Sequence, residues 1–580
     1  MTSLSRHKWF LVCGIVVLTG LAYGLDGYPL LNPDEGRNAE VAREMAESGD
    51  YVVPRLNTAP YLDKPVLFFA SAAVSIRLFG ATEVAVRLPS LLFTIMTVSL
   101  LFWFALREFG FEGAVTAAVV TAASPLVLGF ARTVIFDASL TFCVTLTILS
   151  FYRAFDAYRQ REPENLARVQ ASMRWTVLAW AAMAAAVLTK GPIGMALPLM
   201  IAVAYATFSR EWRPLANLIA VLLFVSILLP WIVAVSREEP GFLRYALVTE
   251  TFTRLTTPEF RRTGPLWYFV PILIAASFPW SAAVLGGWRT QSVLGAKGHR
   301  DLLTVYVLMW IIIPFVFFSL SQSKRPQYIL PLIPAVGLLL ARIWSLSAVR
   351  LPGARAAAVA LGILGVLFLT ISPVFAHAFG ASDAVAIHIP ATGVMLGSIC
   401  VVASLAVGFA GERRALVLLG LALPVSSIPF ISGRLMTSIG KERSSYDMAR
   451  ALAPHLTPET EIVGISTYPL GLSFYLNRTI TLATETGSEL TSNYAVRHPE
   501  SWRTSPGRTF TGAREWREAL SHCSQIQIFI VHRDNEEARS LLRERLPLLA
   551  AHGELESYGP CEPIEFVYRD AANAEVHFAF

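Results

Sequence analysis

The chain has 580 residues, of which 54% are hydrophobic and 16% charged, and its mean hydropathy is +0.52. This composition excludes a soluble enzyme and is typical of a protein that crosses a membrane many times. The formal net charge of +6 is small for the length, so it indicates basic cytoplasmic loops rather than a nucleic-acid partner.

Apolar runs predict a mostly α-helical, polytopic membrane protein with about 13 spans of roughly one bilayer thickness. They fall at residues 9–25, 86–106, 112–130, 133–152, 175–190, 192–208, 214–235, 266–287, 301–320, 326–347, 355–376, 391–410 and 413–431. The first run follows Arg6 and Lys8 with no clear cleavage site, so we interpret it as a signal anchor. The predicted membrane domain is 1–435, with an exterior loop at 26–80 that includes a short interfacial helix at 66–79.

The distribution of basic residues supports this topology with one exception. With the N-terminus inside, most predicted cytoplasmic connections are basic, as the positive-inside rule requires. Five basic residues fall on the outer side instead: Arg254, Arg261, Arg262, Lys324 and Arg325. Basic residues placed against the topological bias are better explained by an anionic ligand than by orientation.

Residues 436–580 are more polar and predict a soluble α/β domain on the exterior face. Helices are expected at 446–455, 513–521 and 535–546, and strands at 461–466, 478–483, 525–531, 564–568 and 575–580. Cys523 and Cys561 lie in this domain, where an oxidising exterior would permit a disulfide, but their proximity cannot be determined from the sequence. Cys13, Cys143 and Cys400 lie in apolar runs and are expected to be buried, inert thiols.

The exterior loop carries a dense set of charges around Asp34. The pattern after Pro33 predicts a helix that stops at Gly49, with Asp34 at its N-cap or first turn and Arg37 facing it. Asp34 as a simple helix cap is one interpretation. However, Glu35 already supplies negative charge there, and a carboxylate beside a guanidinium stays ionised, which suits a base or a cation-stabilising group. We therefore expect an active site in this loop.

A second cluster, Tyr61-Leu62-Asp63-Lys64-Pro65, returns a cation to the outer face before the next apolar helix. Tyr61 and Lys64 would also suit simple anchoring at the membrane interface.

At these residues the chain resembles the glycosyltransferase family 39 proteins, which include the lipid A aminoarabinose transferases and the protein O-mannosyltransferases. The matching segments follow in order through most of the membrane region: Pro33 to Arg37, Tyr61 to Pro65, Arg87 to Pro89, Arg132 to Asp137, Leu188 to Pro192, Pro230 to Trp231, Arg262 with Pro265 to Phe269, Phe278 to Trp280, and Ser321 to Pro331. The pattern is closer to the bacterial aminoarabinose-transferase-like branch than to the mannosyltransferases.

The resemblance implies a GT-C fold, a soluble exterior domain and a sugar donor carried on a polyprenyl phosphate. It implies that the acidic residue at the start of the first exterior loop, here Asp34, is essential. It also implies ligand contacts at Tyr61, Lys64, Asp137 and Tyr328.

Three departures from the aminoarabinose transferases concern the substrate and a metal. Asn38 stands where those enzymes commonly have Tyr, Asp63 where they have Glu, and Thr251, after Glu250, where they have His. The Glu and His form a metal site in at least part of the family. A divalent metal is therefore not carried over to this chain, and no cofactor is assigned.

The negative charge of the donor phosphate requires cationic partners. Several basic residues lie at the predicted outer ends of spans, where a charged side chain must be hydrated or paired. The predicted substrate-binding residues are Arg37, Tyr61, Lys64, Arg132, Asp137, Lys190, Arg262, Lys324, Arg325 and Tyr328. Snorkelling to the lipid headgroups is the alternative for Arg132 and Lys190. For Asp137 the alternative is an ion pair with Arg132 that holds the site together.

Asp34 is the predicted catalytic residue. With a hydroxyl acceptor it would act as general base and give inversion at the anomeric carbon. With a phosphate acceptor no proton need be removed, and it would orient a substrate or stabilise positive charge on the sugar. A retaining mechanism with two carboxylates is a weaker alternative.

These patterns predict an inner-membrane glycosyltransferase that moves a sugar from a polyprenyl (undecaprenyl) phosphate to an envelope acceptor at the periplasmic face. Lipid A or a related lipid is the preferred acceptor, and a protein or another glycan is the alternative. A non-enzymatic transporter of lipid-linked sugars would instead place polar residues on broken helices near the membrane midplane. The polar residues gather at outer loops and span ends, which favours catalysis at a surface.

Overall fold

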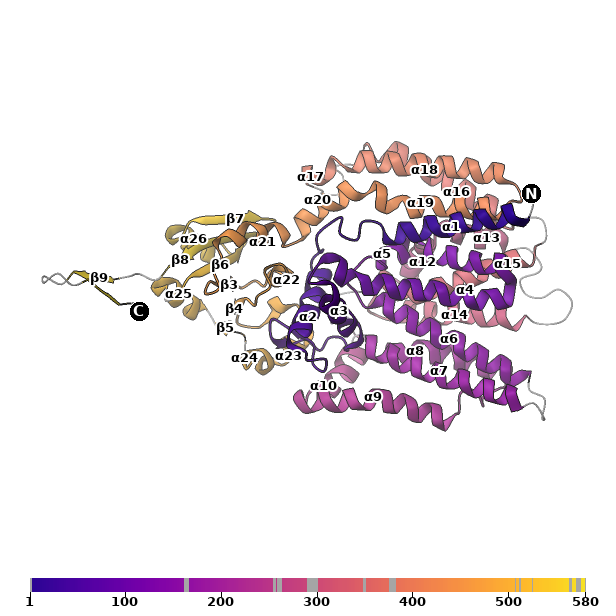
Figure 1. Ribbon diagram of the computed structural model, residues 1–580, viewed down its shortest axis with the longest axis horizontal. Coiled ribbons are helices and arrows are strands. Elements are labelled where there is room, and N and C mark those ends of the chain that lie inside the picture. The colour runs from indigo at the N-terminus through magenta and orange to yellow at the C-terminus, as the bar shows by residue number, and fades with distance from the viewer. Residues whose placement is uncertain are drawn as a thin grey trace. The chain divides into compact units, whose positions relative to one another are not determined.

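The computed structural model describes residues 3–160, 166–253, 257, 263–288, 301–347, 351–374, 382–505, 507, 509–510, 513–523, 525–562, 566–569 and 575–578 (Figure 1). The chain forms two compact units. We call Met1–Gly27, Lys64–Phe68 and Arg87–Met436 the transmembrane unit, and Tyr28–Asp63, Phe69–Val86 and Thr437–Phe580 the α/β unit. The first exterior loop is thus grouped mainly with the C-terminal segment. The predicted division between 435 and 436 stays a prediction.

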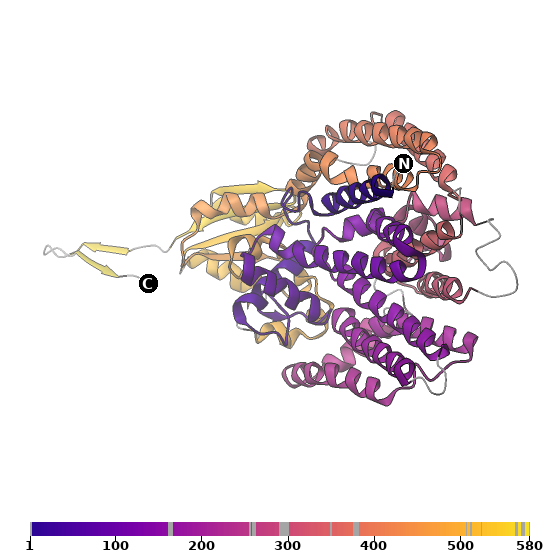
Figure 2. The ribbon, with the colours of Figure 1, turned by 45° about the vertical axis from the view of Figure 1, so that its right-hand side comes forward.

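The transmembrane unit is a bundle of helices, drawn from indigo to orange in Figures 1 and 2. Its elements are α1 (Ser3–Ala22), α4 (Glu83–Ala122, whose first residues lie in the α/β unit), α5 (Pro125–Phe130), α6 (Asp137–Arg159), α7 (Leu166–Lys190), α8 (Ile193–Ser209), α9 (Leu218–Glu238), α10 (Phe242–Arg244), η1 (Tyr245–Thr253), η3 (Leu266–Tyr268), α12 (Phe269–Ala276), α13 (Trp280–Gly287), α14 (Leu302–Leu320), η4 (Pro326–Leu332), α15 (Ile333–Ser345), α16 (Ala354–Ile371), α17 (Asp383–Ala386), α18 (Ile389–Ala410), α19 (Arg414–Ile431) and the first residues of α20 (Gly433–Arg443), which continues into the α/β unit. The element η1 is a π-helix.

Within the described residues, nine helices are long and apolar enough to cross a membrane, or up to ten if one bent pair counts as a span. The protein is therefore a multi-pass membrane protein, as predicted. Every predicted span falls on a helix or a pair of helices, but the number of about 13 stays a prediction.

Two of the predicted apolar runs are interrupted in the structure. The run 112–130 divides where α4 ends and Pro125 begins α5, because the residue before a proline disfavours helical backbone angles. The run 266–287 bends by 103° between α12 and α13, next to Pro279, which has no N–H to continue the ladder. Gly110, at φ 70°, likewise separates two helical pieces of α4.

Hydrogen bonds from buried aromatic side chains join distant helices in the core of the transmembrane unit. The Trp280 indole N–H donates to the Ala123 carbonyl at 3.0 Å, and the Tyr306 hydroxyl donates to the Ile148 carbonyl at 2.7 Å. Such partners are required where no water is available to bind a polar group. Helices α16 and α18 approach closely at Gly365, where a Cβ would lie 2.8 Å from the Gly397 carbonyl oxygen.

The α/β unit contains a six-stranded mixed sheet in the order β5-β4-β3-β6-β8-β7. Its strands are β3 (Glu461–Ile465), β4 (Thr481–Ala483), β5 (Thr509–Phe510), β6 (Gln527–His532), β7 (Leu548–His552) and β8 (Leu555–Cys561). The first four in this order are parallel neighbours, whereas β8 runs antiparallel to β6 and β7. A separate antiparallel pair is formed by β9 (Phe566–Arg569) and β10 (Glu575–Phe578).

Short helices connect these strands: α21 (Tyr446–Leu452), η5 (Ala453–His455), α22 (Leu472–Leu476), η6 (Ser488–Leu490), α23 (Asn493–Arg497), α24 (Pro499–Arg503), α25 (Ala513–His522) and α26 (Glu536–Arg545). The predicted α/β class and its three helices are confirmed. Strands β5, β7 and β8 were not predicted. Cys523 and Cys561 form a disulfide between the end of α25 and β8, which settles the question that the sequence left open.

The first exterior loop folds as α2 (Asp34–Ser48), a two-residue hairpin of β1 (Arg55–Leu56) and β2 (Ala59–Pro60), and α3 (Leu67–Phe79). Gly49 ends α2 at φ 71°, as predicted. The Glu44 carboxylate accepts hydrogen bonds from the N–H groups of Asn57 and Thr58, the two turn residues with positive φ.

Most residues of helix α2 are buried by contacts with protein. Arg43, 2% exposed, donates to both carboxylate oxygens of Glu40 at 2.7 and 2.8 Å, and to Asn477 at 2.9 Å. The side chain of Asn57 bonds both the N–H and the carbonyl of Ile480, just before β4. These contacts explain why the loop folds as part of the α/β unit.

Candidate functional site

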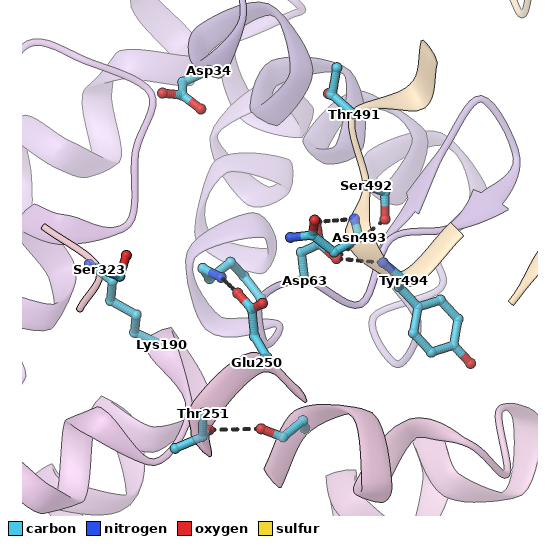
Figure 3. A network of polar contacts seen from close by, with 12 residues as sticks. Asp34, Asp63, Lys190, Glu250, Thr251, Ser323, Thr491, Ser492, Asn493 and Tyr494 are labelled. Carbon is cyan, nitrogen blue, oxygen red and sulfur yellow. Dashed lines mark hydrogen bonds and ion pairs between the residues drawn. The ribbon is translucent and has the colours of Figure 1, made fainter. Parts of the chain in front are cut away.

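Two lysines of the transmembrane unit hold carboxylates that come from other elements. Lys64 Nζ lies 2.5 Å from Glu250 Oε1, and both side chains are 12% exposed (Figure 3). Glu250 belongs to the π-helix η1, a rare element that is frequent at functional sites. Lys190, the last residue of α7, pairs with Asp137, the first residue of α6.

Asp137 has one oxygen left for a ligand. Its Oδ1 accepts from Lys190, whereas Oδ2 is buried without a hydrogen-bond partner among the described residues. The residue is 1% exposed, and a buried carboxylate oxygen without a partner is costly. This oxygen can accept a hydrogen bond from a substrate group.

The two ammonium groups lie against one aromatic ring. Lys64 Nζ is 5.7 Å and Lys190 Nζ is 5.0 Å from the centre of the Phe136 ring. Lys190 Nζ is also 5.3 Å from the Tyr328 ring, whose hydroxyl lies 3.3 Å from Ser323 Oγ. We call Lys64 and Lys190 the lysine pair. The structure therefore brings four of the predicted substrate-binding residues together in one cluster: Lys64, Asp137, Lys190 and Tyr328.

Lys324 and Arg325 lie at the start of η4. The Lys324 ammonium donates to the carbonyls of Ser319 at 2.7 Å and Ser321 at 2.6 Å, and burial lowers its pKa. Arg325 is the N-cap residue of η4 and is partly buried. Two of the three N–H donors of Lys324 therefore hold the end of α14, and a phosphate contact from this residue stays a prediction.

Arg132 follows α5 in the chain, and its side chain reaches the end of α1. Its guanidinium donates to the carbonyls of Leu21 at 3.1 Å and Gly24 at 2.9 Å, and Arg87 donates to the Leu25 carbonyl at 2.7 Å. Arginines on the last carbonyls of a helix satisfy acceptors that the helix leaves open. These bonds give Arg132 a partner other than a headgroup. Arg262 lies outside the described residues.

Asp34 lies in the α/β unit, at the first position of α2 (Figure 3). Its Oδ1 is 2.5 Å from Arg37 Nη2, which confirms that Arg37 faces it. Arg37 also donates to Thr491 Oγ1 at 3.1 Å, and its guanidinium lies 5.7 Å from the centre of the Tyr61 ring. The Asp34 side chain is 35% exposed, so a substrate can reach it.

Arg37 is held charged by its neighbours. Burial by itself would lower its pKa, but Tyr61 and the carboxylates of Asp34 and Asp63 raise it above the ordinary value. The guanidinium is 14% exposed, and its Nε has no hydrogen-bond partner among the described residues.

The residues at the positions of the family's metal do not fit a metal ion. Asp63 accepts from the N–H groups of Asn493 and Tyr494, each at 2.9 Å, and from Ser492 Oγ at 3.3 Å (Figure 3). Glu250 pairs with Lys64, and the Thr251 hydroxyl donates to the Ala246 carbonyl at 2.8 Å. Across the part of the chain that the structure describes, no three His, Cys, Asp or Glu residues gather in a metal-binding group.

Sequence reasoning missed two kinds of residue in these clusters. Phe136 stands in a quoted motif, but an aromatic residue beside an apolar run carries no sign of a site. The peptide Ser492 to Tyr494, which holds Asp63, is more than 400 residues away in the chain. Glu250 was noted for a metal, and no pattern in the sequence pairs it with Lys64.

Comparison with known proteins defines the class of this fold. Residues 34–246 match the family described as dolichyl-phosphate-mannose-protein mannosyltransferase (PMT). The structure superposes on ArnT of Cupriavidus metallidurans bound to undecaprenyl phosphate with a TM-score of 0.80 and 27% identity, over 95% of this chain and 98% of that one. The chain therefore has the GT-C fold of membrane-embedded glycosyltransferases.

Curated relatives carry the name undecaprenyl phosphate-alpha-4-amino-4-deoxy-L-arabinose arabinosyl transferase. The protein of Edwardsiella ictaluri is 31% identical over 63% of this chain and 65% of its own length. One from Pseudomonas fluorescens is 31% identical over 58% of this chain and 57% of its own length. The alignments thus span less than two thirds of these relatives. Together the matches confirm the resemblance to glycosyltransferase family 39, on its aminoarabinose-transferase-like branch.

Proposed function

We propose that this protein transfers a sugar from a polyprenyl phosphate donor to an envelope acceptor, and that the lysine pair binds the donor phosphate. The observation that carries the proposal is the placement of Lys64 and Lys190 on the same ring, Phe136. The likeness to a protein whose structure holds undecaprenyl phosphate supports the class of donor.

The charges of this cluster suit the chemistry of the leaving group. Two ammonium groups and two carboxylates, Glu250 and Asp137, balance one another before substrate binds. A sugar-phosphate diester carries one negative charge, and the released polyprenyl phosphate carries up to two. Cations that gain a stronger interaction as this charge develops stabilise the transition state more than the substrate. Lys64 and Lys190 would therefore accelerate departure of the phosphate as well as bind it.

Asp34 is the proposed catalytic residue. With a hydroxyl acceptor, its carboxylate would take the proton as the acceptor oxygen attacks the anomeric carbon. With a phosphate acceptor, it would orient a substrate or stabilise positive charge on the sugar ring. Its 35% exposed side chain and its ion pair with Arg37 support either role.

The proposed acceptor is lipid A or a related envelope lipid, with a protein or another glycan as the second candidate. The proposed location is the bacterial inner membrane, with the α/β unit in the periplasm. The relatives' name supports an aminoarabinose donor. The side chains at Asp63, Glu250 and Thr251 support a reaction in which no metal is held at these positions.

The proposal is tested with the purified full-length chain, undecaprenyl phosphate-linked 4-amino-4-deoxy-L-arabinose and lipid A. Transfer should be detected by mass spectrometry of the lipid product, and the envelope lipids of cells should lose the modified species when the gene is removed. An unchanged lipid A profile would contradict the preferred acceptor. Absence of transfer to any lipid, protein or glycan, with donor transport retained, would favour the transporter.

A further inference from the structure

The ring of Phe136 lies close to two lysine ammonium groups that come from different elements. Lys64 comes from the segment before α3 and Lys190 from the end of α7, and their ammonium groups lie 5.7 and 5.0 Å from the same ring centre. The face of an aromatic ring attracts a cation within about 6 Å of its centre. Both distances satisfy this range.

A ring shared by both lysines matters because each lysine pairs with a different carboxylate. Glu250 holds Lys64 from η1, and Asp137 holds Lys190 from α6. Two like charges repel, and each lysine has a long, flexible side chain whose ordering costs conformational entropy. Without a shared partner, each ammonium group would follow its own carboxylate. The Phe136 ring is a contact that both ammonium groups have in common.

The ring itself is held firmly. Phe136 precedes α6, and its carbonyl accepts from the Leu140 N–H at 3.0 Å and the Ser139 hydroxyl at 2.8 Å. Its ring meets the Phe68 ring edge to face at 6.4 Å, and Phe68 is fully buried. A fixed ring face limits where both ammonium groups can lie before the ligand arrives, which reduces the ordering cost of binding.

We infer that Phe136 is a positioning residue that aligns Lys64 and Lys190 for one phosphate group of a polyprenyl phosphate. The ring face attracts the ammonium groups without accepting a conventional hydrogen bond from them. It therefore orders the cations while leaving their N–H donors to oxygen ligands, the carboxylates now and a phosphate in the complex. This inference rests on the proposed function, because the ligand is the donor's phosphate.

The test measures binding of undecaprenyl phosphate to the detergent-purified full-length chain, together with its apparent thermal midpoint. Phe136→Leu should raise the Kd about tenfold, whereas Phe136→Tyr, which keeps a ring face, should stay within about threefold of wild type. Phe142→Leu is the matched control, because Phe142 lies on α6, the helix that directly follows Phe136 in the chain, is partly buried, and its ring is tilted against the Phe93 ring at a centroid distance of 5.9 Å. Its Kd should not change. If Phe136→Leu fails to fold, Phe136→Met replaces it, with a similar volume and no ring.

A double-mutant cycle separates positioning from general packing. In a Lys64→Gln/Lys190→Gln background, Phe136→Leu should change the Kd less than about twofold, because the ring no longer acts through the lysines. Equal losses in both backgrounds, or equal Kd values for the Leu and Tyr variants, would overturn the inference. If the wild-type chain does not bind undecaprenyl phosphate at all, the proposed function itself fails, and this outcome is distinct from the other two.

Discussion

In the transmembrane unit each acid of the candidate site pairs with a lysine from another element, whereas the acids of the exterior loop are held by their own helix or by backbone N–H groups. Glu250 and Lys64 are 186 residues apart, but Asp34 and Arg37 are three apart. Asp63 accepts two backbone N–H bonds. The first region thus holds cations ready for an anion, and the second fixes carboxylates in place.

The largest effect on sugar transfer is expected from a substitution at Asp34 in the exterior loop. Asp34→Asn keeps the size of the side chain but removes its charge and basicity, so kcat for sugar transfer should fall at least about a hundredfold. Glu47→Gln is the control, because Glu47 lies on the same helix with a half-exposed side chain. Initial rates at saturating donor measure the effect. Retained transfer by a normally expressed Asp34→Asn chain would remove Asp34 from catalysis.

The next effect concerns the lysine pair. Lys190→Gln can still donate a hydrogen bond to Asp137 but carries no charge, so the Kd for undecaprenyl phosphate should rise about tenfold to a hundredfold. Lys441→Gln, at an exposed position of α20, should leave the Kd unchanged. Equal Kd values for Lys190→Gln and wild type would show that this cation does not contact the phosphate.

A substitution at Asp63 tests whether the carboxylates of the exterior loop stabilise the fold. Asp63→Ala leaves the N–H groups of Asn493 and Tyr494 without their acceptor, which should cost about 1–3 kcal/mol of stability. Thermal or protease resistance of the full chain measures this loss. An Asp63→Ala chain as stable as wild type would contradict the structural role of this carboxylate.

Glu44 provides a pH test of the loop. Burial and the charge of Glu40 raise its pKa from 4.5 to about 8. A carboxyl with a raised folded-state pKa stabilises the fold at low pH, and this contribution is lost as pH rises from about 4.5 through about 8. The thermal midpoint of wild type should therefore fall by a few degrees relative to Glu44→Gln across this window. Parallel curves for the two proteins would contradict the raised pKa.

The smallest expected effect is that of a chelator. Because the acids at the metal positions already hold Lys64 and backbone N–H groups, incubation with EDTA should leave the transfer rate within experimental error. The same chain incubated with EDTA that has been saturated with Mg²⁺ controls for the procedure. Loss of activity that added zinc restores would show that a metal takes part.

Local features could be predicted from the sequence, and contacts between distant segments could not. The spacing of Asp34, Arg37 and Gly49 predicts α2 and its ion pair, because residues three apart lie on one side of a helix. Sequence proximity suggested Arg132 as the partner of Asp137, but Lys190 pairs with it, and Arg132 holds carbonyls at the end of α1. Strand β8 contains Gly559 and Pro560, which obscure the alternation typical of a strand.

The central claim is that the lysine pair binds the donor phosphate while Asp34 acts in the transfer step. It is tested most directly by measuring undecaprenyl phosphate binding and sugar transfer for wild type, Asp34→Asn and Lys64→Gln/Lys190→Gln. We predict that Asp34→Asn binds with the wild-type Kd but does not transfer sugar, whereas the double lysine variant binds much more weakly with a Kd that is still measurable. Wild-type binding by the double lysine variant, or a lost phosphate affinity in Asp34→Asn alone, would contradict the account.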